Sequence, residues 1–251
     1  MSAAARPRRV SFLLILIATG SLADPAFAQD ISINLGGAGN AGVSERAIQL
    51  IALLTVLSIA PSILIMMTSF TRIVVVLSLL RTALGTATAP PNSVIIALAM
   101  FLTAFVMRPT LQKSYDDGIK PLVANEITVE EALKRASVPL RGFMQKNVRE
   151  QDLKLFMDLS GEPPPNTPAE LSLRILMPAF MISELKRAFE IGFLLFLPFL
   201  IIDLVVASVL MSMGMMMLPP VVVSLPFKLI FFVLVDGWAL MAGSLVQSYG
   251  T

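Results

Sequence analysis

Beyond Glu190 at its start, the long apolar stretch of residues 189–246 is interrupted by three charged residues, Asp203, Lys228 and Asp236. A charged side chain inside an apolar membrane helix costs roughly 2.5–3.5 kcal/mol on insertion scales, so such groups normally face protein or water. We expect these residues to form ion pairs between helices, within one chain or between neighbouring copies. Ion-coupled transporters use the same residue types as a proton relay, and intramembrane proteases use a pair of aspartates. The protease is disfavoured, because Lys228 would stabilise the charge of an acid pair.

A turn rich in methionine divides the same stretch, and five of the seven residues 211–217 are methionine. Gly214, Pro219 and Pro220 are typical of a tight connection between two helices. Methionine side chains are long, unbranched and flexible, so they close irregular gaps. One interpretation is ordinary packing at the end of a helix. If several copies surround an axis, the turn instead becomes a ring of soft side chains that holds back ions and yields to a passing polypeptide.

The composition excludes most other functions. The chain has 251 residues, of which 56% are hydrophobic, and this fraction is typical of a membrane protein. The net charge of +2 is too small to indicate a nucleic-acid partner. Without cysteine or histidine the chain lacks disulfides, thiolate nucleophiles, the usual general base and the commonest transition-metal ligand. We therefore expect no enzymatic activity, no cofactor and no metal site.

The first 28 residues have the features of a secretory signal peptide. Arginines precede a short apolar run at residues 10–17, and Ala26-Phe-Ala28 fits the small-residue cleavage pattern. An uncleaved anchor helix is the alternative, but the apolar run is short for a span. Residues 29–46 follow as a polar, glycine-rich leader. Their G-x-G-x-x-G pattern, from Gly37 to Gly42, lacks the acidic residue about twenty positions later that a dinucleotide site requires.

Apolar runs divide the rest of the chain into three parts. Residues 47–108 predict a first hydrophobic helical hairpin, residues 109–188 a charged helical domain, and residues 189–251 a second hydrophobic hairpin. The first hairpin contains a charge-free run, Ile48 to Phe70, and a run from Val94 to Met107 that is short for a span. With a third span between residue 189 and the methionine turn, and a fourth at about 221–246, we expect an all-α membrane protein with four membrane segments.

The charged domain has clear helix signals. Thr128-Val-Glu-Glu131 is a capping box, and a second one at residues 167–170 opens a helix that we expect to continue through Pro178 into the third segment. Separate short helices are predicted around residues 143–148 and 153–159. Glu184, Lys186 and Arg187 stand at the expected membrane boundary. They either anchor the helix at the interface or contact an adjacent copy.

The orientation follows from the signal peptide. If it is cleaved, residue 29 lies outside, and four spans place residues 109–188 in the periplasm of a bacterium. The short connection between Arg72 and Arg81 then lies inside, in agreement with the positive-inside rule. We therefore expect a protein of the bacterial inner membrane.

Several long strings resemble the FliP family of type III secretion export-gate proteins. Those around the first hairpin are Met66-Met-Thr-Ser-Phe-Thr-Arg-Ile-Val-Val-Val-Leu77, Leu84-Gly-Thr86 and Ala89-Pro-Pro-Asn92. Those in the second half are Ser183-Glu-Leu-Lys186, Ile191-Gly-Phe193, Pro198-Phe-Leu-Ile-Ile-Asp203, Gly214-Met-Met-Met-Leu-Pro-Pro220, Leu225-Pro-Phe-Lys228 and Val235-Asp-Gly-Trp238. The resemblance covers roughly residues 47–248 in order.

This resemblance implies a pore subunit of the flagellar basal body, with no catalysis. Family members form a pentamer that assembles with FliQ, FliR and other export-apparatus membrane proteins into a conical helical pore. Unfolded flagellar subunits pass through that pore, and the family's methionine gasket falls on Met215, Met216 and Met217. The finished gate is raised partly out of the lipid, with its helices shielded by neighbouring subunits. A homologous injectisome subunit is the alternative, but such proteins typically lack a cleaved leader.

Overall fold

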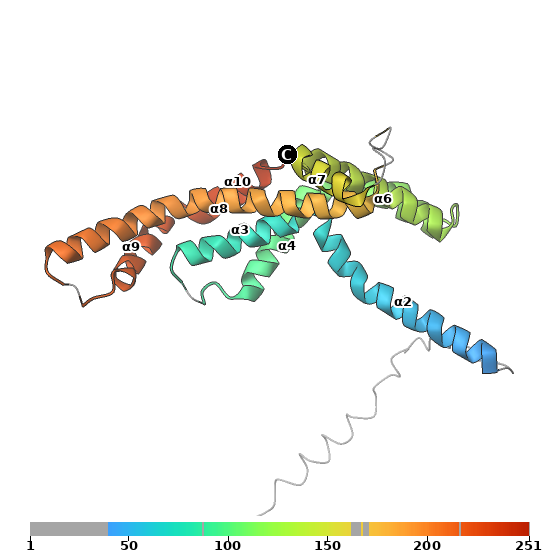
Figure 1. The fold of residues 1–251 in the computed structure, drawn as a ribbon, viewed down its shortest axis with the longest axis horizontal. Helices are drawn as coiled ribbons and strands as arrows, with labels where there is room; N and C mark the ends of the chain where they lie inside the picture. Colours follow the sequence, from blue (N-terminus) through green and yellow to red (C-terminus); the bar gives the residue numbers. More distant parts are fainter. Residues whose placement is uncertain (1–39, 87, 162–166, 168–170, 216, 251) are drawn as a thin grey trace, which may run out of the picture. The chain divides into compact units, whose positions relative to one another are not determined.

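The computed structural model describes residues 40–86, 88–161, 167, 171–215 and 217–250. All regular structure in these residues is helical (Figure 1), as the composition predicted. The predicted signal peptide, the second capping box except Thr167, and Met216 lie outside them. The chain divides into two units, residues 1–55 and 56–251, and helix α2 (Asn40–Met66) runs from the first into the second.

The first unit contributes the start of α2. This helix begins at Asn40, inside the segment 29–46 that we expected to be a flexible leader. The G-x-G-x-x-G pattern therefore ends inside a helix. Ile48, Ile51 and Leu54 on this helix are exposed, which is the state expected of an apolar helix that lacks its membrane or protein surroundings.

The second unit begins with a hairpin of two helices, α3 (Phe70–Ala83) and α4 (Asn92–Ser114). The predicted run from Ile48 to Phe70 is not one continuous helix, because α2 ends at Met66 and a short turn precedes α3. Arg72 consequently lies inside α3 rather than at the end of a membrane helix.

Helix α4 continues beyond the expected boundary at residue 108. It passes through a single π-helical turn, η1 (Tyr115–Ile119), into α5 (Lys120–Val123), so that residues 92–123 form 32 consecutive helical residues. The short run from Val94 to Met107 thus gains its length from the charged segment that follows it. The hairpin and the charged domain are joined without a break.

The charged segment forms two further helices, α6 (Val129–Asn147) and α7 (Glu150–Ser160). The first capping box is confirmed, because the Thr128 hydroxyl accepts a hydrogen bond from the backbone N–H of Glu131 at 3.3 Å. The separate helix predicted at residues 143–148 is wrong, since α6 continues through Pro139 to Asn147.

Helix α8 (Leu173–Ser212) is 40 residues long and contacts α3, α6, α7 and α9. Its passage through Pro178 is confirmed, and it also contains Pro198. It begins later than expected, at Leu173, where the Ser172 hydroxyl accepts a hydrogen bond from the N–H of Arg174 at 3.3 Å. Ser172 therefore caps this helix, in place of Thr167.

The last two helices, α9 (Pro220–Leu234) and α10 (Gly237–Gln247), show that the predicted fourth segment is not one continuous helix. They meet at a bend of 64°. Asp236 adopts a left-handed conformation with φ of 50°, which ends the helical ladder. A Cβ atom on residue 237 would lie 2.2 Å from the Phe232 ring, so only glycine fits this close approach.

Two helices of the described residues are long and apolar enough to cross a membrane, residues 92–123 and 173–212. The bent α9–α10 pair would be a third. The expected four spans are therefore not all present as continuous helices in this part of the chain. The interior consists of two apolar clusters. The first joins α3, α4, α8, α9 and α10 around Ile73, Leu80, Ala99, Phe199, Phe232 and Leu245, and the second joins α6 and α8 around Met144, Leu176 and Phe180.

Candidate functional site

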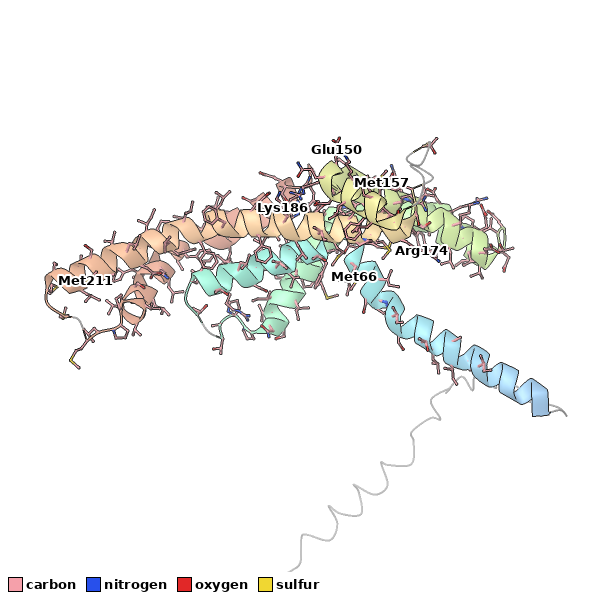
Figure 2. All side chains as sticks on the ribbon, in the orientation of Figure 1. Met66, Glu150, Met157, Arg174, Lys186 and Met211 are labelled. Atoms are coloured by element: carbon pink, nitrogen blue, oxygen red, sulfur yellow. The ribbon has the colours of Figure 1, made fainter. Side chains whose placement is uncertain are left out.

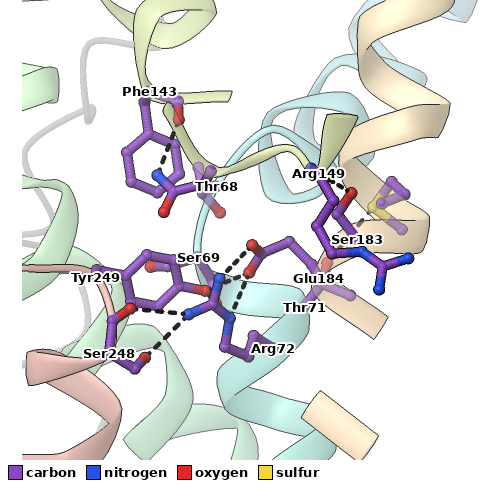
Figure 3. Close-up of polar contacts among 12 residues, drawn as sticks. Thr68, Ser69, Thr71, Arg72, Phe143, Arg149, Ser183, Glu184, Ser248 and Tyr249 are labelled. Carbon is purple, nitrogen blue, oxygen red and sulfur yellow. Dashed lines mark hydrogen bonds and ion pairs between the residues drawn. The ribbon is translucent and has the colours of Figure 1, made fainter. Parts of the chain in front are cut away.

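A buried ion pair connects α3 to the first third of α8 (Figure 3). Arg72 binds Glu184 in a fork, with Nε donating to Oε2 at 2.9 Å and Nη2 donating to Oε1 at 2.5 Å. Both side chains are at most 1% exposed. Two desolvated charges at such a site are tolerated only when their remaining hydrogen-bonding capacity is also used.

The carboxyl end of the chain supplies those remaining contacts. Arg72 Nη1 donates to the backbone carbonyl and to the hydroxyl of Ser248, at 3.3 and 3.0 Å. The Tyr249 hydroxyl donates to Glu184, and the centre of its ring lies 3.8 Å from the guanidinium carbon of Arg72. Burial of its hydroxyl raises the pKa of Tyr249 above its ordinary value. The phenol therefore stays neutral and acts as a donor.

A second polar group is built around Ser183, the residue directly before Glu184 on α8. The Ser183 hydroxyl lies 2.7 Å from the Asp152 carboxylate on α7 and accepts a hydrogen bond from the N–H of Arg149 at 3.0 Å. Arg149 also forms a bidentate pair with Asp152, with both distances 2.7 Å. Hydrogen bonding to Arg149 and then to Ser183 holds the pKa of Asp152 below its ordinary value. Neighbouring residues of α8 thus anchor both the hairpin and the charged domain.

The structure brings together two of the three charged residues in the apolar stretch. Lys228 Nζ on α9 lies 2.6 Å from Asp203 Oδ2 on α8, and Ser224 donates to the other carboxylate oxygen at 2.5 Å. Lys228 also donates to the carbonyl of Ala83, at the end of α3, at 3.3 Å. A cation at this position satisfies one of the carbonyls left free by the last turn of a helix. The pair therefore ties the α8–α9 hairpin to the α3–α4 hairpin.

The third charged residue, Asp236, stands apart from that pair. It lies at the bend between α9 and α10, where its carboxylate makes no side-chain capping bond. The two aspartates therefore do not form the shared acid pair of a protease in this chain. Across the described residues, no cluster of acidic side chains has the arrangement of a metal site.

The methionine turn follows α8 directly. Helix α8 ends at Ser212, Gly214 has φ of +75°, and α9 begins at Pro220. The predicted tight turn between two helices is therefore confirmed. Met211, Met213 and Met217 are exposed, the last at 98%, whereas Met215 is partly buried. Figure 2 shows Met211 at the end of α8, far along that helix from Lys186.

The boundary residues separate into buried and accessible groups. Glu184 is fully buried inside this chain, so in this structure it is not a surface contact. Lys186 is exposed and lies 4.0 Å from the exposed Glu190, and Arg187 is partly exposed. The sequence did not predict that Arg72 and Tyr249 are the partners of Glu184. An arginine within a long apolar run was the available signal for Arg72, because it demands a buried acceptor.

Comparisons with known proteins agree with these features. The model of the FliP family matches residues 53–245. A protein of Caulobacter vibrioides described as flagellar biosynthetic protein FliP is 61% identical, over 96% of this chain and 91% of that protein. Proteins with the same description from Bacillus subtilis and Rhizobium meliloti are 52% and 48% identical, and the matches cover 86% and 96% of this chain and 98% and 99% of those proteins.

Proposed function

Because the chain belongs to the FliP family of flagellar biosynthetic proteins, we propose that it is a core pore subunit of the flagellar type III protein export gate. In this proposal, unfolded flagellar subunits cross the bacterial inner membrane through a pore to which this chain contributes. Copies of the chain, five in the family's arrangement, assemble with FliQ and FliR. The role is structural rather than catalytic.

One observation carries this proposal, the methionine turn at the tip of the α8–α9 hairpin. Among its described side chains Met211, Met213 and Met217 are exposed, the last at 98%. A large apolar side chain in that state favours contact with another molecule. In a ring of copies, Met215, Met216 and Met217 would meet around the channel and close it with flexible thioether side chains.

The exposed apolar helices support an assembly. Between α8 and α9 lies a groove of about 530 Å³ lined only by apolar side chains. The outer faces of α4, α8 and α9 are also apolar, with Phe101, Phe193 and Val233 exposed. Neighbouring subunits and lipid together would cover these faces. The charged segment 109–188 would then lie in the periplasm, and Lys186 and Arg187 remain candidates for contacts between copies.

An ion-coupled transporter using Asp203 is less well supported. Its carboxylate already contacts Lys228 and Ser224, an arrangement typical of a structural pair. Replacing Asp203 with asparagine separates the two functions. A transporter would assemble but lose ion flux, whereas a structural pair predicts weakened assembly.

The gasket is tested by replacing Met215, Met216 and Met217 together with alanine. We expect the export complex to form and the membrane to leak ions, measured as loss of potential in cells or as conductance of the purified complex. The matched control replaces the partly buried Met177 on α8 with alanine. A complex that assembles fully and remains impermeable would overturn the proposed gasket.

A further inference from the structure

The last described residues of the chain occupy a position that the gasket does not explain. Ser248 and Tyr249 follow α10 and dock against the buried Arg72–Glu184 pair (Figure 3). The guanidinium spends two nitrogens on Glu184, and its third nitrogen binds only Ser248 among the bonds of this network. Removal of the chain end would therefore leave a buried donor without a partner.

Tyr249 contacts three helices at once. It is only 4% exposed, its hydroxyl reaches Glu184 on α8, and its ring covers Arg72 on α3. The same ring stacks on Phe143 of α6, with ring centres 5.8 Å apart and an angle of 25° between the planes. One side chain thus joins the hairpin, the long helix and the charged domain to the end of α10.

Ser248 and Tyr249 are preceded by α9 and α10, which together form an arm that begins at the methionine turn. Helices α9 and α10 are bent by 64° with respect to each other, so the rigidity of one helix does not by itself fix the position of the other. α9 begins directly after the methionine turn and carries Lys228. The α9–α10 arm is consequently held at the middle of α9 by Lys228 and at its far end by Ser248 and Tyr249.

We infer that Ser248 and Tyr249 form a latch, which positions the α9–α10 arm on α3 and α8. The latch thereby fixes the position of the methionine turn, from which α9 starts, relative to those two helices. The latch acts through Arg72 and Glu184, so Tyr249 is a positioning residue. This inference rests on the proposed export-gate function, because the position of the turn matters only if the arm belongs to a gate.

Ser69 offers a reporter for the latch. It is fully buried, its hydroxyl has no hydrogen-bond partner, and its backbone carbonyl lies 3.4 Å from the Tyr249 hydroxyl. Since the natural chain has no cysteine, a Ser69→Cys substitution introduces one thiol under the latch at little structural cost. The rate at which a membrane-permeant maleimide labels that thiol in the extracted export complex then measures opening of the latch.

With the latch intact, we expect slow labelling. Tyr249→Leu should accelerate labelling by about tenfold or more, because it removes the hydroxyl and the ring together. Tyr249→Phe keeps the ring over Arg72 and should restore most of the protection, which a general loss of folding would not do. Ser244→Ala on the exposed side of α10 is the matched control and should label slowly. Equal labelling of the Leu and wild-type proteins would overturn the latch.

A second reporter separates local opening from unfolding. Ala99 is fully buried in the first apolar cluster, and an Ala99→Cys thiol should stay protected in Tyr249→Leu. If both thiols become reactive together, the chain end is a general stabilising element and the latch is rejected. If Tyr249→Leu opens only the Ser69 site, secretion of flagellar subunits should fall while Tyr249→Phe retains it. Normal secretion with an open latch would overturn the inference, yet it would leave the gasket and the proposed function unaffected.

Discussion

The two ion pairs that link α8 to other helices differ in how far the chain encloses them. The Arg72–Glu184 pair is at most 1% exposed, and side chains from α3, α8 and the chain end use all of its charged atoms. In the Lys228–Asp203 pair the lysine is 6% exposed but the aspartate is 30% exposed. The first pair is complete within one chain, whereas the second leaves an open side toward which a neighbour could pack.

Charge in an apolar sequence therefore has two separate uses. An enclosed pair specifies how helices of one chain meet, because any misalignment leaves a buried charge uncompensated. A half-open pair costs less to desolvate and can complete its surroundings in an assembly.

Glu184→Gln should have the largest effect. It leaves Arg72 charged and buried without its counter-ion, and breaking such a pair costs about 3–5 kcal/mol of unfolding free energy. The measurement is denaturant unfolding in detergent, followed by fluorescence of Trp238, the only tryptophan. Glu190→Gln, on the exposed side of the same helix, is the control. A loss no greater than that of the control would mean that the pair is not enclosed.

Asp203→Asn should cost less, about 1–2 kcal/mol, because its carboxylate is partly solvated and Lys228 keeps the carbonyl of Ala83 as a partner. We expect a greater loss in the assembled complex than in the isolated chain, which the same titration on both preparations measures. Equal losses in the two preparations would contradict the idea that this pair is completed by a neighbour.

A third ion pair, Arg149–Asp152, lies outside the apolar helices and can be tested by the pH dependence of stability. The folded pKa of Asp152 lies below the ordinary value because of Arg149 and Ser183. A depressed folded pKa adds stability that is present above the unfolded value, about 3.9, and is lost as pH falls through the folded pKa. Asp152→Asn should therefore be less stable near pH 7 but lose less stability on acidification below about pH 4. Parallel thermal melts across this range measure both effects, and identical acid profiles would refute the assignment.

Lys186→Ala should have the smallest effect on the isolated chain. Its contact with Glu190 spans 4.0 Å and both side chains are about half exposed, and such pairs contribute about 0–1 kcal/mol. If Lys186 contacts an adjacent copy, the variant instead lowers the yield of complex while the melting temperature of the isolated chain stays unchanged. Native mass measurement of the extracted complex distinguishes these results.

Local signals in the sequence identified several parts of the molecule correctly. The Thr128 capping box, the passage of a helix through Pro178 and the turn at Gly214 were all predicted, because capping, proline and glycine act within one or two helical turns. Helices α4 and α6 continue through residues 108 and 143, where the sequence predicted boundaries. Apolar or charged composition changes there, but the backbone hydrogen bonds continue.

The pairing of charges was only half predictable. Three charged residues in an apolar stretch indicate ion pairs, yet the sequence does not say which residues meet. Asp203 and Lys228 pair with each other, while Asp236 instead closes a bend whose geometry depends on Phe232 packing against Gly237. Glu184 was expected at a boundary, and its burial under Tyr249 requires contacts between residues 65 positions apart.

Periodicity, composition and local turn chemistry depend on near neighbours, so they were sufficient to predict an all-helical chain of membrane composition, its family and the position of its methionine turn. Contacts between distant helices, by contrast, place the chain end over the Arg72–Glu184 pair and keep Asp236 apart from Lys228. These positions depend on which distant helices pack together, since a buried charge is satisfied by whatever donor or acceptor the fold brings within reach.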